Sequence, residues 1–290
     1  ISEQQAFERT VAPFKAFMLR NVGEGELNLM QGVAARRLGI PAPQTPSEVN
    51  LRVLVPAFML SELRIAPPMP RRALRMVMRE VIRRNALTSG SVYVQVTRGV
   101  APRDHAFPAT VQTQTVITVK RPRPVNPEAV AEGVKVITLP DLRWERCDIK
   151  TVALLPNVLA KQAARENGAY EAWFVDGEGR VTEGASTNAW IVTDNNELIT
   201  RQTDSGILAG ITRQSLKSIA GKLQLKLVER PFTLAEAKKA REAFITSATS
   251  FVTPVVKIDG QPVGEGKPGA TARRLREEYV RFANEGEAVT

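Results

Sequence analysis

Residues 146–150 read Arg-Cys-Asp-Ile-Lys, and residues 181–188 read Val-Thr-Glu-Gly-Ala-Ser-Thr-Asn. Lys150 stands at the edge of the apolar run 152–155, which is typical of a segment that enters a core. Burial lowers the pKa of a lysine, and a neutral lysine amine can form a Schiff base with a carbonyl. Glu183 follows on a turn after a short predicted strand, between small residues that allow a flat group to approach.

A lysine that forms a Schiff base and an acid that faces a ring nitrogen are the two groups that pyridoxal phosphate requires from a protein. Their spacing alone is weak evidence, because most lysines and glutamates are solvated. In the alternative interpretation, Lys150 reaches solvent and Glu183 belongs to an ordinary turn. Other motifs are needed to decide between the two.

The composition is ordinary for a soluble globular protein: 290 residues are 43% hydrophobic, with 19 Gly and 19 Pro. We expect no membrane span and no signal peptide, because a long apolar run and a basic N-terminal region are both missing. The single cysteine, Cys147, fits a reducing compartment, and we expect a cytoplasmic protein. With one Cys and one His, no metal site is expected.

The formal net charge of +10 raises the alternative of a non-catalytic protein that binds nucleic acid. The basic residues are spread along the chain, and small clusters such as Arg71-Arg72 are not interleaved with aromatic residues. Solvated helix faces account for most of them, and a site for anionic substrates and a phosphate accounts for others. We expect no nucleic-acid partner.

The proline-rich segment 121–127 favours an extended linker between two domains. We expect a smaller N-terminal α/β domain over residues 1–120 and a larger domain, with the lysine, over residues 128–290. Mixed helices and strands in both parts predict an α/β (α+β) fold. The predicted helices cover 11–18, 33–38, 71–85, 156–167, 210–222 and 270–282; the predicted strands cover 92–96, 111–119, 134–139, 171–176, 181–182, 188–193 and parts of 243–258, before a hairpin turn at 259–260.

Two further features suit anionic ligands. Gly210-Ile211-Thr212 opens a predicted helix, whose first N–H groups and hydroxyl favour a phosphate. Arg103 and His105 share one loop and suit a carboxylate. Each feature has an ordinary alternative, because many helices begin this way, loop arginines are usually solvated, and a lone histidine is more often structural than catalytic.

Together these motifs resemble the fold-type IV pyridoxal-phosphate aminotransferases over roughly residues 61–280, and among them those that act on D-amino acids. Many motifs in the family's order carry the resemblance: Thr97-Arg98-Gly99, Pro102-Arg103-Asp104-His105, Arg143-Trp144, Cys147-Asp148-Ile149-Lys150, Leu159-Ala160-Lys161-Gln162, Gly168-Ala169-Tyr170-Glu171-Ala172, Thr182-Glu183-Gly184 with Asn188, Gly206-Ile207-Leu208, Gly210-Ile211-Thr212-Arg213, Thr246-Ser247 and Thr253-Pro254-Val255.

The resemblance implies a two-domain fold-type IV enzyme that forms a homodimer, with the active site at the interface. Lys150 would carry the Schiff base and move the substrate proton, and Glu183 would stabilise the protonated ring nitrogen. Arg103 and His105, contributed across the interface, would bind the α-carboxylate of the substrate. The remaining cofactor contacts would come from Leu208, against the ring, and from the phosphate-binding residues Ile211, Thr212 and Thr249.

The implied reaction is a ping-pong transamination, in which D-alanine and 2-oxoglutarate give pyruvate and D-glutamate. Two alternatives use the same fold. A transaminase of branched-chain L-amino acids or (R)-amines is disfavoured by Pro102-Arg103-Asp104-His105, and an aminodeoxychorismate lyase fits the Thr-Glu-Gly and Gly-Ile-Thr-Arg motifs less well.

The first 60 residues depart from the family pattern. Ala34 stands where a carboxylate-binding tyrosine is expected, and Val55 stands at the position of a phosphate-binding arginine, with Arg52 nearest to it. Ala248 replaces a late threonine, for which Thr249 is the nearest substitute. Loss of one charge-assisted phosphate contact costs about 1.5–3 kcal/mol of cofactor binding. Either residues 1–60 are recorded wrongly, or the segment has diverged and the cofactor is held weakly.

Overall fold

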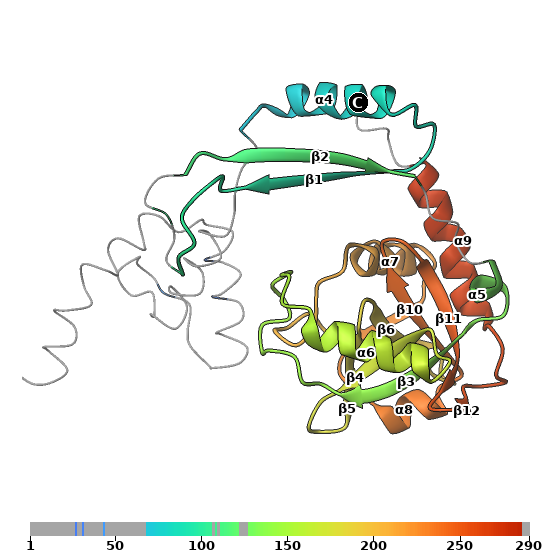
Figure 1. The fold of residues 1–290 in the computed structure, drawn as a ribbon. Coiled ribbons are helices and arrows are strands. Elements are labelled where there is room, and N and C mark those ends of the chain that lie inside the picture. Colours follow the sequence, from blue (N-terminus) through green and yellow to red (C-terminus); the bar gives the residue numbers. More distant parts are fainter. Residues whose placement is uncertain are drawn as a thin grey trace, which may run out of the picture. The chain divides into compact units, whose positions relative to one another are not determined.

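The computed structural model describes residues 68–105, 108, 111–121 and 127–285, together with positions 27, 31 and 43. The chain forms two compact units, residues 1–123 and 124–290 (Figure 1), and the division falls within the segment 121–127. The helices predicted over 11–18 and 33–38 lie outside the described residues, as do Ala34, Arg52 and Val55.

The described part of the first unit is a helix beside a two-stranded antiparallel ribbon. Helix α4 (Arg71–Arg84) follows Pro70, and α4 contacts strand β2 (Gln114–Lys120), which pairs with β1 (Ser91–Thr97). The predicted strand over 111–119 begins three residues too early. The reason lies in the register: Gln114 pairs with Thr97, the last residue of β1, so earlier residues have no strand opposite them.

The second unit is built on a ten-stranded mixed sheet in the order β8-β7-β6-β10-β11-β3-β4-β5-β9, with β12 paired to β11. The parallel pairs are β11–β3, β3–β4 and β7–β8. A mixed α/β fold was expected, and it is confirmed. The strands are β3 (Val134–Pro140), β4 (Glu171–Val175), β5 (Arg180–Gly184), β6 (Asn188–Val192), β7 (Glu197–Thr200), β8 (Lys226–Glu229), β9 (Phe232–Thr233), β10 (Glu242–Ser247), β11 (Phe251–Ile258) and β12 (Gln261–Pro262).

The helices of this unit lie against different parts of the sheet (Figure 1). Helix α6 packs on β3 and β4, while α7 and α9 pack together and against β10. The helices are α5 (Pro127–Ala131), α6 (Leu155–Glu166), α7 (Ile211–Lys222), α8 (Leu234–Lys239) and α9 (Ala270–Glu285). Among the described residues, none of the helices combines the length and apolar character needed to cross a membrane.

Strand β6 shows how the core is organised. Ala189 and Ile191 pack in one buried cluster, and Trp190 and Val192 pack in a second cluster with α7 and α9. Successive side chains of a strand point to opposite faces, so β6 is buried on both. Trp190 also stacks on Phe244 of the neighbouring β10, with ring centroids 5.5 Å apart. The strand is therefore held rigidly on both sides, and its first residue is Asn188.

Candidate active site

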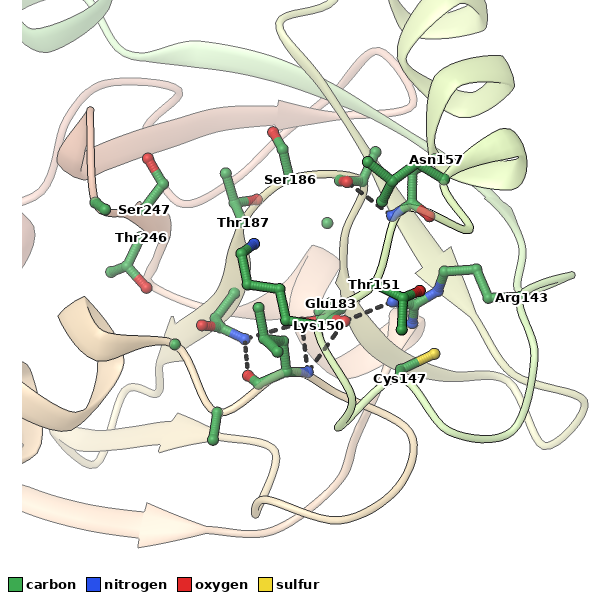
Figure 2. Close-up of a pocket in the computed structure, with 18 of the residues that line it drawn as sticks. Arg143, Cys147, Lys150, Thr151, Asn157, Glu183, Ser186, Thr187, Thr246 and Ser247 are labelled. Atoms are coloured by element: carbon green, nitrogen blue, oxygen red, sulfur yellow. Dashed lines mark hydrogen bonds and ion pairs between the residues drawn. The ribbon is translucent and has the colours of Figure 1, made fainter. Parts of the chain in front are cut away.

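A cavity of about 730 Å³ lies within the second unit. Four segments line it: residues from 143 to 161, 183–188, 208–212 and 246–249. Its volume lies in the usual range for small-molecule sites, about 300–1,000 Å³. Figure 2 shows Lys150 extending into the space that Glu183, Thr187 and Ser247 surround.

Lys150 differs from the sequence-based expectation, because it is exposed at the cavity rather than carried into a core. The apolar run 152–155 is exposed too: Val152 is 97% exposed and Leu155 69%. This run forms the bend before α6, so its side chains are not directed into the sheet. The prediction that this segment enters the core of the same chain is therefore wrong.

Glu183 lies on β5 and is only 6% exposed. Its carboxylate accepts hydrogen bonds from Arg143 Nη1 at 2.5 Å, from Asn188 Nδ2 at 3.0 Å and from the Leu208 N–H at 3.1 Å. Burial raises the pKa of Glu183 to about 7, although the charge and hydrogen bond of Arg143 act in the opposite direction. Glu183 also lines the cavity, so this carboxyl group is available to a ligand there.

Arg143 is a site residue to which sequence reasoning assigned no role. Its guanidinium makes two hydrogen bonds to Asp141, at 2.8 and 2.9 Å, and lies 4.5 Å from the centre of the Phe174 ring. Asp141 in turn accepts a hydrogen bond of 2.7 Å from Thr182 Oγ1. The available signal was the Asp-x-Arg spacing just after a predicted strand, close to the motif that ends at Lys150.

The N-terminus of α7 opens into the same cavity. Gly210 is its N-cap residue, no side chain caps the helix, and no acidic residue occupies its first turn. Thr212 is buried, and Ile211 is 65% exposed. Free N–H groups and the helix dipole favour an anion at such an end. A Cβ at Gly210 would lie 2.2 Å from Asn188 Oδ1, so the close approach requires glycine.

Hydroxyl groups line another part of the cavity. Thr249, predicted as a phosphate ligand, is exposed there, and its Oγ1 lies 3.4 Å from Ser247 Oγ. Thr187 is buried, and its Oγ1 has no hydrogen-bond partner among the described residues. Neither Thr187 nor Ser247 was predicted as a ligand from the sequence. An amine, a buried carboxyl, an open helix N-terminus and an unpaired hydroxyl together fit pyridoxal phosphate.

Arg103 and His105 lie in the first unit, in the loop between β1 and β2, and both side chains are exposed. The role of this pair in binding a carboxylate stays a prediction. Among the described residues, no group of His, Cys, Asp and Glu side chains is placed to hold a metal ion.

Different parts of the chain match the models of two protein families. Residues 59–258 match the model of amino-transferase class IV, and residues 1–70 match the model of the FliP family. Ala34 and Val55 therefore lie in a range that follows the pattern of a different family. The aminotransferase model begins only at residue 59, so it does not cover the positions where the tyrosine and the arginine were expected. The departure of the first 60 residues from the aminotransferase pattern agrees with this.

Two curated relatives are D-alanine aminotransferases. That of Staphylococcus haemolyticus is 39% identical over 206 residues, which are 71% of this chain and 72% of the relative. That of Listeria monocytogenes serotype 4b (strain F2365) is 40% identical over 215 residues, 73% of this chain and 74% of the relative.

Solved structures of branched-chain amino acid aminotransferases are similar to this chain. The enzyme of T.th., solved with pyridoxamine 5′-phosphate, has a TM-score of 0.63 and 30% identity, covering 76% of this chain and 73% of that one. That of Escherichia coli has a TM-score of 0.63 and 25% identity, covering 89% and 79%. A putative 4-amino-4-deoxychorismate lyase from Legionella pneumophila, at 22% identity and a TM-score of 0.61, covers 86% and 82% and shares the fold. The family model extends over all the residues that line the cavity, the curated relatives match more than two thirds of the chain, and the chain therefore belongs to the class IV aminotransferases.

Proposed function

We propose that this aminotransferase acts on D-amino acids, with pyridoxal 5′-phosphate as cofactor. In the first half-reaction it takes the amino group of D-alanine and releases pyruvate. In the second it gives the amino group to 2-oxoglutarate and releases D-glutamate. The observation that carries the proposal is that one cavity joins Lys150, Glu183 and the open N-terminus of α7.

Pyridoxal phosphate supplies a carbonyl carbon that amines attack and a ring that accepts the electrons of a bond broken at the substrate Cα. Lys150 would hold the cofactor through its amine, and its Nζ, when free, would serve as the base for the proton on the substrate Cα. Glu183 would favour a proton on the ring nitrogen. The first N–H groups of α7 and the Thr212 hydroxyl would bind the phosphate, and Leu208 would pack against the ring.

The preference for D-amino acids rests on two observations. The curated relatives with 39% and 40% identity are D-alanine aminotransferases. The loop with Arg103 and His105 offers two groups for an α-carboxylate, and in our proposal they fix the substrate so that its Cα hydrogen faces Lys150. Branched-chain L-amino acids are the competing substrates in our proposal, because two of the solved structures named above are branched-chain amino acid aminotransferases.

We also propose that the enzyme is a homodimer. Val152, Leu155, Val158 and Leu159 are each more than half exposed, and they lie just beyond Lys150, at the start of α6. A contiguous set of exposed aliphatic side chains beside a ligand cavity is typical of a protein–protein interface. A second copy of this chain would cover them. Analytical ultracentrifugation should find a dimer for the wild type, and a shift to monomer in Leu155→Glu/Leu159→Glu.

Absorption spectroscopy with each alanine enantiomer tests the proposed function. The purified protein, supplied with pyridoxal phosphate, should show the visible band of a lysine-bound cofactor. D-alanine should bleach the band and L-alanine should not. Bleaching by the L enantiomer alone would instead favour a branched-chain L-amino acid transaminase. Absence of the band at saturating cofactor would contradict the proposed site itself.

A further inference from the structure

Arg143 is a buried cation that the reaction described above does not use. The exposed fraction of its side chain is 6%, and that of the Glu183 side chain is 7%. Taking two charges out of water is costly, and the cost is repaid only when the pair is well aligned and its other hydrogen-bonding groups are satisfied. The surroundings of Arg143 meet this condition, and they indicate a function for the pair.

The guanidinium is fixed from several sides. Its Nε and Nη2 donate to the two oxygens of Asp141, and Nη2 also lies 3.2 Å from the Gly206 carbonyl oxygen and 3.3 Å from Thr182 Oγ1. The Phe174 ring lies against it. The remaining nitrogen, Nη1, donates a hydrogen bond to Glu183 Oε1. Arg143 therefore cannot turn toward solvent without losing several hydrogen bonds.

The Glu183 carboxylate is oriented by the same network. Oε1 accepts from Arg143, Oε2 accepts from Asn188, and the Leu208 N–H lies within 3.2 Å of both oxygens. Arg143 thus lies on one side of the carboxylate and Asn188 on the other. Figure 2 shows Glu183 behind Lys150, with dashed lines running from its carboxylate to Arg143 and to the unlabelled neighbours.

The titratable groups that face Glu183 come mainly from the segment between β3 and α6. They are Arg143, Asp141 and the Cys147 thiol, with Lys150 across the cavity. Burial raises the pKa of Glu183, Arg143 opposes the rise, and Asp141 adds to it. Without Arg143 the pKa of Glu183 would rise further, so the neutral form of the carboxyl would be favoured more strongly. A neutral carboxyl does not favour a protonated ring nitrogen beside it.

We propose that Arg143 is a positioning residue that favours the ionised form of Glu183 and directs its carboxylate toward the cavity, while Asp141 and Thr182 fix the guanidinium. The inference rests on the role proposed above for Glu183. The inference adds that Arg143, which is not expected to contact the cofactor, influences through Glu183 how strongly the cofactor ring would accept electrons.

The test follows the ionisation of Glu183 directly. The full chain is labelled with ¹³C at glutamate Cδ, without added cofactor, and its carboxyl resonances are followed by NMR as the pH is varied. Glu183→Gln assigns the resonance. In Arg143→Met the titration midpoint should rise by about 1–3 pH units, the usual effect of removing one opposite charge at contact distance. Arg143→Lys, which retains the charge, should recover most of this shift.

Arg146→Met is the matched control. Arg146 binds Asp148 through Nε and Nη2, as Arg143 binds Asp141, but both partners are 30% exposed and neither contacts Glu183. Its loss should leave the Glu183 midpoint unchanged. If Arg143→Met does not fold because Asp141 is left unpaired, the double variant Asp141→Asn/Arg143→Met removes both charges, and the midpoint should still rise above that of Asp141→Asn alone.

An unchanged midpoint in Arg143→Met, or in the double variant relative to Asp141→Asn, would overturn the inference whatever the activity. A raised midpoint with a matching loss of transamination, recovered in Arg143→Lys, would support both the inference and the role of Glu183. A raised midpoint with full transamination would support the coupling between the two side chains and overturn the proposed role of Glu183. The two failures are therefore distinguishable.

Discussion

The side-chain amide of Asn188 donates to Glu183 Oε2 at 3.0 Å, and the same nitrogen lies 2.9 Å from the Leu208 carbonyl oxygen. Asn188 begins β6, and Leu208 precedes the N-terminus of α7 by three residues. One amide group therefore joins the acidic group of the site to the segment that leads into α7. This connection has measurable consequences.

We expect Asn188→Asp to lower both stability and cofactor affinity. The substitution keeps the size of the side chain but replaces a donor with a second anion beside Glu183. The free energy of unfolding should fall by about 1–3 kcal/mol, because one buried and one partly buried acceptor lose their donor. Urea denaturation at pH 8 measures this. A variant as stable as the wild type at that pH would show that the amide hydrogen bonds contribute nothing.

The raised pKa of Glu183 predicts a pH dependence of stability. The pKa rises from an ordinary 4.5 to about 7 in the folded protein, so the folded state binds the proton more tightly than the unfolded state. Stability relative to Glu183→Gln should therefore decrease from pH 4.5 to 7, by about 3 kcal/mol in total, and stay constant above. Asp141 titrates below this window: burial acts to raise its pKa, but the hydrogen bond and charge of Arg143 lower it overall.

The difference between the two unfolding free energies, measured in urea at several pH values, checks this prediction. Glu183→Gln also removes the ion pair with Arg143, but the cost of that loss is the same at every pH in the window. The pH dependence of the difference in unfolding free energy therefore reports the titration of Glu183. A difference that does not vary between pH 4.5 and 7 would contradict a raised pKa.

Gly210→Ala should weaken phosphate binding at α7. The added Cβ would lie 2.2 Å from Asn188 Oδ1, and the buried Asn188 cannot move away without losing its two hydrogen bonds. We expect at least a tenfold loss of pyridoxal-phosphate affinity, equivalent to about 1.4 kcal/mol, measured by equilibrium dialysis. Gly221→Ala is the control within the same helix: no atom lies within 4 Å of its added Cβ, so it should retain affinity and gain about 0.5–1 kcal/mol of stability.

Lys150→Ala should abolish the visible band and the transamination. Because the side chain is exposed, its loss should leave the melting temperature within about 2 °C of the wild type, as expected for a surface substitution. Lys135→Ala, at an exposed position on β3, should retain both band and activity. Full transamination in Lys150→Ala would refute the assignment of the Schiff-base lysine.

Local patterns predicted the elements that frame the site. The helix at 155–166, with Pro156 in its first turn, and the helix after Gly210 carry strong start signals, and both are present. The strand that begins at Asn188 was also predicted. Glu183 was placed on a turn after residues 181–182, which is wrong: β5 continues to Gly184, because Gly184 pairs with Trp173 of β4. α5, β7, β8, β9 and α8 were missed, because they are short, two to six residues, and because β8 and β9 pair with strands distant in sequence.

The exposure of Lys150 could not be read from its neighbours. An apolar run predicts burial but does not say against which surface, and the run at 152–155 is left uncovered within the described part of its own chain. The role of Arg143 was hidden for a similar reason. Asp141 is close in sequence, but Glu183 is forty residues away, and only the pairing of β3 with β4 and of β4 with β5 brings the two together.

The register of β6 determines both the packing of the core and the position of Asn188 in the site. A deletion of one residue from this strand would exchange the side chains assigned to the two clusters, sending Trp190 to the place of its smaller neighbours. The same slip would carry the amide of Asn188 away from Glu183 and Leu208. If Glu183 and α7 hold the cofactor as proposed, a molecule with a misaligned sheet would bind it more weakly, so cofactor retention would report on the correct register of β6.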